Sequence, residues 1–277
     1  PHEIPEKLTI SFTGKSLKAY LNLVDEIQKT PGRQIFDKFK KKFRINGKYI
    51  DKNGSEVILK GKARITGDWK DHIGKNGLAS LSISLKKSNI GGVTNFRLLL
   101  PETKNSKYEI FWSSLMGEIG FPVPVRRFID VDLQGINHTF IFEEKPEKEF
   151  LESIGFREAP IIEFDERQIW ANRSKDLSDN HSSQWKIKNS DFIKNDTSKI
   201  ISLKAIALKN LKQNNKAIQN FNHDRSWVFS RHVDNEVTRN YDEINDSYAK
   251  HGLITHNRKF IYDPLYNDYL PIYFDGN

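Results

Sequence analysis

Residues 127–144 read RFIDVDLQGINHTFIFEE and contain the clearest structural pattern in the chain. Apolar and polar side chains alternate on both sides of Gln134 and Gly135, which is the period of a β-strand. A glycine at the break is typical of a tight turn between two strands. We therefore predict an antiparallel hairpin that turns at Gln134-Gly135.

The segments upstream of this hairpin combine strands with helices. Residues 55–66 and 80–86 alternate apolar and polar side chains, so each is predicted to be a strand. Two helices are predicted as well. The first is capped by Ser16 and stopped at Pro31, and the second ends at Gly120.

The segments downstream of the hairpin become more helical. A short helix is expected after Pro146, a buried strand at 160–164, and a final hairpin at 258–274. Residues 172–195 are polar and irregular, so they are interpreted as a loop. A longer helix at 197–213 is expected to bury its apolar positions, which are Ile200, Leu203, Ile206, Ala207 and Leu211.

This order of elements predicts an α+β protein in two parts. An N-terminal lobe of strands and helices is expected at 1–171, and a polar linker or loop at 172–196. A partial, mostly helical second lobe is expected at 197–277, and it ends in the hairpin described above.

The composition narrows the class of protein. Hydrophobic residues make up 37% and charged residues 29%, which is typical of a globular chain, and no run of roughly 18 apolar residues appears. The absence of cysteine excludes thiolate chemistry and favours an exported bacterial protein of the envelope or exterior. Nothing in the sequence indicates an oligomeric state.

The net charge of +8 is read in two ways. One is a solvated basic surface, and the other is attraction to polyanions. In the densest basic run, residues 38–44, the aromatic side chains are expected to anchor the chain while the lysines stay in water. Nucleic acid is not an expected partner, because no nucleic-acid-binding motif appears.

Three motifs together resemble the CotH-type spore-coat family of atypical kinase-like proteins. They are KARITGDWKDH at 62–72, LMGEIGFPVPVRRFIDVDLQGINHTFIFEE at 115–144, and HGLITHNRKFIYDP at 251–264 followed by LPIYFDGN at 270–277. The resemblance implies an atypical protein-kinase-like fold that uses ATP with Mg²⁺ or Mn²⁺ to phosphorylate an envelope or extracellular protein. A kinase-like domain would continue beyond Asn277, so the chain is expected to be a fragment or to have a minimal second lobe.

The resemblance assigns metal and catalytic roles near the end of the chain. Asp275 and Asn257 match the metal ligands, although each also suits a simple turn. The position of the usual catalytic aspartate is occupied by Gly252, so His251 is the candidate base, or else a structural histidine. His256 is a weaker candidate for the base than His251, since one of the two histidines is expected only to brace the loop.

Nucleotide binding is assigned to six residues by the same resemblance. The strand at 80–85 carries serines, including Ser82 and Ser84, where the family has a cation. The alternative interpretation of Lys62 and Arg64 is that they belong to the alternating surface charge of an edge strand. The assigned residues are Lys62, Arg64, Gly67, Glu143, Glu144 and Arg157.

These departures leave two further functions open. A catalytically inactive kinase-like module that binds a surface protein is the first alternative, because Gly252 and the serines replace residues that catalysis needs. A polyanion-binding protein is the second, because the chain is basic.

Overall fold

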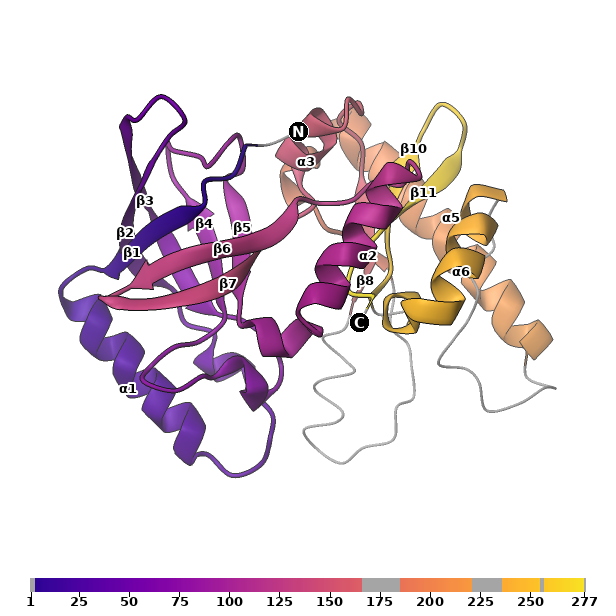
Figure 1. The fold of residues 1–277 in the computed structure, drawn as a ribbon. Helices are drawn as coiled ribbons and strands as arrows, with labels where there is room; N and C mark the ends of the chain where they lie inside the picture. Colours follow the sequence, from indigo (N-terminus) through magenta and orange to yellow (C-terminus); the bar gives the residue numbers. More distant parts are fainter. Residues whose placement is uncertain (1–2, 166–184, 221–235, 255–256, 277) are drawn as a thin grey trace. The chain divides into compact units, whose positions relative to one another are not determined.

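The computed structural model describes residues 3–165, 185–220, 236–254 and 257–276, with the backbone alone at 210–220. It divides into two compact units, and each is described by itself (Figure 1). Unit 1 consists of Pro1–Ile110 with Val125–Lys145, and unit 2 of Phe111–Pro124 with Pro146–Asn277. The chain therefore leaves unit 1 after Ile110 and returns to it for the predicted hairpin.

Unit 1 is a closed barrel of seven strands in the order β1-β2-β3-β4-β5-β7-β6. Its neighbouring strands are antiparallel except for β1 and β6, which run parallel, with Lys7 opposite Asp130. This parallel pairing closes the barrel. The strands are β1 (Lys7–Phe12), β2 (Phe43–Ile50), β3 (Glu56–Ile65), β4 (Leu81–Leu85), β5 (Asn95–Leu99), β6 (Arg126–Leu133) and β7 (Ile136–Glu144).

The hairpin predicted from 127–144 is present as β6 and β7. Both turn residues have positive φ, 58° at Gln134 and 84° at Gly135, as a two-residue turn that follows strand twist requires. The backbone N–H of Gly135 also donates a 2.7 Å hydrogen bond to Oδ1 of Asp132. The strands predicted at 55–66 and 80–86 are likewise confirmed as β3 and β4.

Alternate residues of the barrel strands face an apolar interior, as the period of two requires. The helix α1 (Lys15–Lys29) buries four apolar side chains against this core, which are Tyr20, Leu23, Val24 and Ile27. It begins one residue before the predicted cap Ser16, and no side chain caps it. In the basic run 38–44, Phe39 and Phe43 are buried, so the aromatic residues anchor the chain as expected.

Unit 2 is built on a four-stranded antiparallel sheet in the order β11-β10-β8-β9. The strands are β8 (Ile161–Phe164), β9 (Trp185–Ile187), β10 (Lys259–Asp263) and β11 (Asp268–Ile272). Its helices are α3 (Lys148–Ser153), α5 (Asp196–Asn220) and α6 (Glu236–Tyr248), while α2 (Lys107–Glu118) crosses the division between the units. No helix in the described residues is long and apolar enough to span a membrane.

The predicted fold class, an α+β, atypical protein-kinase-like fold with a mostly helical second lobe, is wrong. Unit 1 is a closed barrel, and unit 2 contains a four-stranded sheet. The prediction missed the strands β1, β2, β5 and β9, and with them the parallel β1–β6 pairing. Such pairing depends on contacts between distant segments, and it leaves no mark on local periodicity.

The helix predicted at 197–213 is longer than expected and rotated about its axis. Ile200 and Leu203, predicted to be buried, are 68% and 67% exposed, whereas Ala205 and Lys209 are buried. The ammonium group of Lys209 lies 3.8 Å from the ring centroid of Phe260, and aromatic rings attract cations at this distance. Of the other positions predicted to be buried, Ile206 packs against the core, Ala207 is exposed, and the side chain of Leu211 lies outside the described residues. The buried face therefore matches the predicted one only in part.

Candidate functional site

Three sequence-predicted residues converge in unit 2. His251 lies in a short 3₁₀ turn (Lys250–Leu253), Asn257 precedes β10, and Asp275 follows β11. Nδ1 of His251 lies 3.2 Å from the backbone oxygen of Asp275 and 3.5 Å from its Oδ1. Nδ2 of Asn257 donates a 2.9 Å hydrogen bond to the backbone oxygen of His251. The residues assigned to catalysis and to metal binding thus form one cluster.

Two glycines allow the backbone segments of this cluster to approach closely. A Cβ at Gly252 would lie 3.0 Å from the backbone oxygen of Phe274, and one at Gly276 would lie 2.8 Å from Cβ of Ala249. Gly252 therefore has a packing role at the position where the family resemblance expects an acidic residue.

Asp275 has a backbone conformation that is uncommon for residues other than glycine. Its φ is 56°, in the left-handed region, where aspartate and asparagine are enriched among side-chain-bearing residues. Its side chain is only 12% exposed. Residues held in this region cluster at functional sites, but turn residues such as Gln134 and Asn267 adopt it as well, so the conformation alone does not distinguish Asp275.

The hydrogen bonds of this cluster define which atoms remain for chemistry. Because the backbone oxygen of Asp275 can only accept, its contact with Nδ1 of His251 is a hydrogen bond in the tautomer that carries the ring proton on Nδ1. In that tautomer Nε2 is the acceptor nitrogen, and it lies 3.4 Å from Nδ2 of Asn257. Because the amide nitrogen of Asn257 donates to a backbone oxygen, its Oδ1 is the end able to bind a cation.

The residues present fit a hard divalent cation such as Mg²⁺. Asp275 offers a carboxylate and Asn257 an amide oxygen, and Mg²⁺ is commonly held by one or two such groups together with water and substrate phosphates. Within the described residues, no group of three or more His, Cys, Asp or Glu side chains could hold a metal.

In unit 1, a row of polar side chains crosses the outer face of the barrel. Arg64, Ser82, Arg97, Glu143 and Arg126 lie opposite one another on β3, β4, β5, β7 and β6. Side chains in one such row share one face of a sheet. The predicted Arg64 and Glu143 thus belong to a single polar surface.

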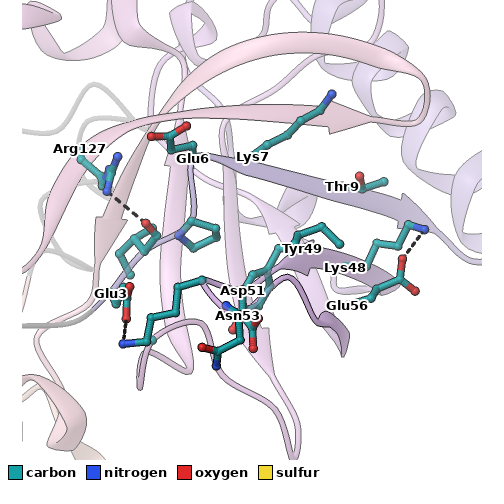
Figure 2. A pocket seen from close by; sticks show the side chains of 15 residues that line it. Glu3, Glu6, Lys7, Thr9, Lys48, Tyr49, Asp51, Asn53, Glu56 and Arg127 are labelled. Carbon is teal, nitrogen blue, oxygen red and sulfur yellow. Dashed lines mark hydrogen bonds and ion pairs between the residues drawn. The ribbon is translucent and has the colours of Figure 1, made fainter.

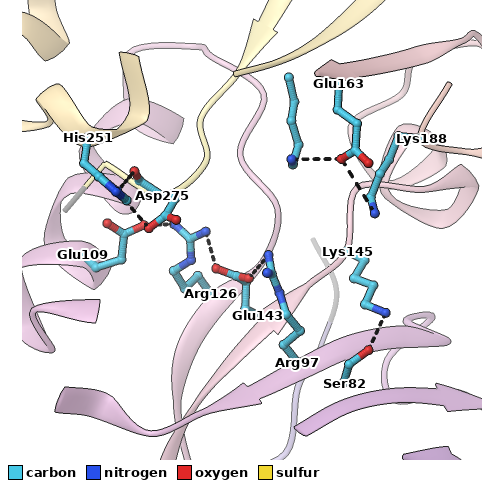
Figure 3. A network of polar contacts seen from close by, with 11 residues as sticks. Ser82, Arg97, Glu109, Arg126, Glu143, Lys145, Glu163, Lys188, His251 and Asp275 are labelled. Atoms are coloured by element: carbon cyan, nitrogen blue, oxygen red, sulfur yellow. Dashed lines mark hydrogen bonds and ion pairs between the residues drawn. The ribbon is translucent and has the colours of Figure 1, made fainter. Parts of the chain in front are cut away.

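Part of this row forms a buried network of ion pairs (Figure 3). Arg126 contacts Glu109 with one guanidinium nitrogen and Glu143 with the other, and Glu143 also contacts Arg97. The side chains of Glu109, Arg126 and Glu143 are fully buried, whereas that of Arg97 is 21% exposed. The network therefore reaches solvent through Arg97.

Sequence reasoning missed several cations of this surface. Arg97 and Arg126 pair with Glu143. Nζ of Lys145 donates a 2.7 Å hydrogen bond to Ser82, in a strand that carries no cation of its own (Figure 3). A charged residue between apolar neighbours, as in Phe96-Arg97-Leu98, was a signal that could have found one of them.

The other predicted nucleotide-binding residues do not join the buried network. Lys62 is exposed on β3, and Gly67 follows that strand with a φ of 97° and the ring of His72 packed against it. Glu144 belongs to the opposite face from Glu143 and accepts a 3.0 Å hydrogen bond from the backbone N–H of Val125. Arg157 is exposed and belongs to unit 2.

Unit 1 also contains a cavity of about 880 Å³ beside β1 and β2 (Figure 2). Four of its charged side chains form two ion pairs, Lys52 with Glu3 at 2.9 Å and Lys48 with Glu56 at 2.7 Å. None of the sequence-predicted site residues lines it. We therefore do not assign the predicted chemistry to this cavity.

Comparison with known families and with curated proteins finds no family model and no curated protein that matches this chain. The resemblance to the CotH-type family therefore stays a prediction that rests on the three motifs.

Proposed function

We propose that the chain is an ATP- and divalent-metal-dependent phosphotransferase that acts on an envelope or extracellular protein. The observation that supports the proposal is the contact of His251 with Asp275 and with Asn257, which brings the proposed base next to the two proposed oxygen ligands. The proposal rests on this cluster and on the motifs, and it requires no particular fold.

In the proposed reaction, a hydroxyl oxygen of the acceptor protein attacks the γ-phosphorus of ATP. A new oxygen–phosphorus bond forms, the bond from the γ-phosphorus to the bridging oxygen breaks, and ADP leaves. Nε2 of His251 accepts the hydroxyl proton, while the contact to the backbone oxygen of Asp275 holds the proton on Nδ1. A bound Mg²⁺ or Mn²⁺ would supply charge stabilisation, held by Asn257 and Asp275.

The decisive experiment compares Asp275→Asn with Asp268→Asn. Asparagine tolerates a left-handed backbone, so Asp275→Asn removes the negative charge without adding strain at φ 56°. Asp268 lies on the same hairpin outside the cluster, and its substitution is the matched control. ATP binding is measured by calorimetry with Mg²⁺, Mn²⁺ or EDTA, and transfer with labelled ATP and candidate acceptor proteins.

We expect Asp275→Asn to abolish metal-dependent ATP binding and transfer, and Asp268→Asn to retain both. Metal-dependent transfer that persists in Asp275→Asn would refute the proposed site. A wild-type chain that binds no ATP with metal would refute the proposed function.

A second candidate is an inactive module that binds a surface protein and transfers no phosphate. Its support is Gly252, which has no side chain to serve as base and is packed against the backbone of Phe274. ATP binding without transfer to any acceptor, the chain itself included, would favour this function over the first.

A further inference from the structure

The cavity beside β1 and β2 is large enough to hold a small ligand (Figure 2). Its volume of about 880 Å³ lies within the range of roughly 300–1,000 Å³ that is usual for ligand pockets. Residues 3–9 and 48–56 supply all of its described lining except Gly91 and Arg127. Every described lining residue belongs to unit 1, so the cavity is a feature of that unit alone.

The charges that line the cavity balance. Among the described lining residues, four side chains are acidic and four are basic. The acidic ones are Glu3, Glu6, Asp51 and Glu56, and the basic ones are Lys7, Lys48, Lys52 and Arg127. A site for an anion concentrates positive charge, and a site for a cation concentrates negative charge. The balanced lining therefore suits a ligand without net charge.

The lining is also far more polar than that of an ordinary pocket. Besides the charged groups, it includes the hydroxyl groups of Thr9 and Tyr49 and the amide group of Asn53. Pockets for apolar ligands are lined mainly by hydrophobic side chains. One large apolar side chain, that of Ile50, lines the cavity while 57% exposed. A matching ligand would therefore carry many hydrogen-bonding groups and a limited apolar face.

Several groups of the lining are held in place by the protein itself. One guanidinium nitrogen of Arg127 donates a 3.1 Å hydrogen bond to the backbone oxygen of Ile4 (Figure 2). Oδ1 of Asp51 accepts hydrogen bonds of 2.9 Å and 2.8 Å from the backbone N–H groups of Asn53 and Ser55. The two ion pairs of the cavity are exposed, and exposed pairs add little to stability. Their order is better explained as preorganisation, which lowers the entropy lost when a ligand binds.

Four other lining side chains are available to a ligand. Those of Glu6, Lys7, Thr9 and Asn53 form no hydrogen bond or ion pair with any described residue. Figure 2 shows Lys7 and Thr9 projecting from β1. A carboxylate accepts hydrogen bonds, an ammonium group donates them, and a hydroxyl or an amide group does both. Sugar hydroxyl groups likewise donate and accept, so this mixture can pair with several of them at once.

We propose that the cavity binds a short, uncharged oligosaccharide. The sugar hydroxyl groups pair with Glu6, Lys7, Thr9 and Asn53, and the C–H face of one sugar ring packs on Ile50. The ligand class follows from the balanced charge, the mixed donors and acceptors, and the single exposed apolar side chain. The inference goes beyond the proposed function, since this binding needs neither ATP, nor metal, nor the cluster in unit 2.

The test is a calorimetric titration without ATP or metal. The probes are maltotriose, cellotriose and triacetylchitotriose, with trigalacturonate as an anionic comparison. The test variant is Lys7→Met/Thr9→Val, and the control is Lys60→Met/Ser11→Ala. Each variant removes one ammonium and one hydroxyl group from the strands of the barrel, but Lys60 and Ser11 do not line the cavity. Asn53→Ala, in an exposed turn, is a second test variant whose substitution leaves every strand unchanged.

We expect the wild type to bind at least one neutral probe, and the test variant to bind it at least about tenfold more weakly. The control should stay within about twofold of the wild type, and Asn53→Ala should also lose affinity. No binding of any neutral probe at about 10 mM, equal weakening in test and control variants, or tighter binding of trigalacturonate would overturn the proposal. Asp275→Asn should retain this binding, so the outcome is independent of the proposed function.

Discussion

Any side chain at Gly252 would place its Cβ 3.0 Å from the backbone oxygen of Phe274. This contact is with backbone, so it can be relieved only by moving the turn that carries His251 or the segment that carries Asp275. The absence of a side chain at 252 is therefore part of how the candidate site is assembled.

We predict that Gly252→Ala destabilises the protein by about 1–3 kcal/mol, as overpacking typically does. It should also weaken metal-dependent ATP binding, because the cluster must open to admit the methyl group. The control is Gly117→Ala, which is helical and whose nearest neighbour would be 3.9 Å from the new Cβ. Denaturant unfolding should show Gly117→Ala to be neutral or stabilising by up to about 1 kcal/mol. Equal stability of the two variants would contradict this account.

Arg126→Met should destabilise the protein by about 3–5 kcal/mol, because it leaves Glu109 and Glu143 buried with less compensating charge. Lys48→Met removes an exposed ion pair with Glu56 and should cost no more than about 1 kcal/mol. Urea unfolding of both variants measures the difference. Similar losses would mean that the buried network contributes no more than a surface pair.

The stability of the barrel unit should fall in mildly acidic solution because of His72. Burial lowers the pKa of His72 below its ordinary value of 6.5, and the charges of Lys104 and Arg97 lower it further against the opposing effect of Asp71 and Asp68. The unfolded chain therefore binds a proton more readily than the folded one. Stability is then greatest above pH 6.5 and decreases as the pH falls from there toward the lowered pKa.

His72→Phe retains a ring against Gly67 but cannot titrate, so its unfolding free energy should depend less on pH over this window. Thermal unfolding of both proteins between about pH 7.5 and 5 measures this pH dependence. An identical pH dependence in the variant would exclude His72 as the cause.

Lys209→Met tests the aromatic cluster that surrounds a buried ammonium group. Nζ of Lys209 lies 3.8 Å from the ring centroid of Phe260, 4.4 Å from that of Tyr269 and 5.4 Å from that of Trp185. Methionine fills similar space without the charge, so the variant should lose about 2 kcal/mol if the cation–π attraction is desolvated. Lys204→Met, on the exposed face of the same helix, should change unfolding by less than about 0.5 kcal/mol. A stabilised Lys209→Met would show that the ring cluster prefers an apolar occupant.

Local patterns predicted some of the strands and helices, but they missed four strands and the way in which the strands assemble. The alternation around Gln134-Gly135 predicted β6 and β7 together with the turn between them. By contrast, the helix α5 buries Lys209 and exposes Leu203, because the aromatic side chains of β9, β10 and β11 attract a cation. No periodicity rule that counts lysine as polar predicts that face.

The candidate site shows the same contrast between residues that are near in sequence and residues that meet only through strand pairing. His251, Asn257 and Asp275 lie together because they flank one hairpin and the turn before it, and the roles that the motif assigns to them stay predictions. The cations around Glu143 were missed, since Arg97, Arg126 and Glu143 lie opposite one another only after three separate strands have paired. Contacts of that kind depend on register, which the sequence of one strand does not specify.

The pairing of Lys7 with Asp130 has a consequence for how the protein is made. During synthesis, β1 leaves the ribosome long before its parallel neighbour β6 exists, so the barrel cannot close until both strands of the 126–144 hairpin have been translated. Pairing of such distant segments is slow, and the open sheet exposes a strand edge in the meantime. Synonymous codons that slow translation just after residue 144 should therefore change the yield of folded protein without altering its stability. A chaperone that covers this strand edge should have the same effect.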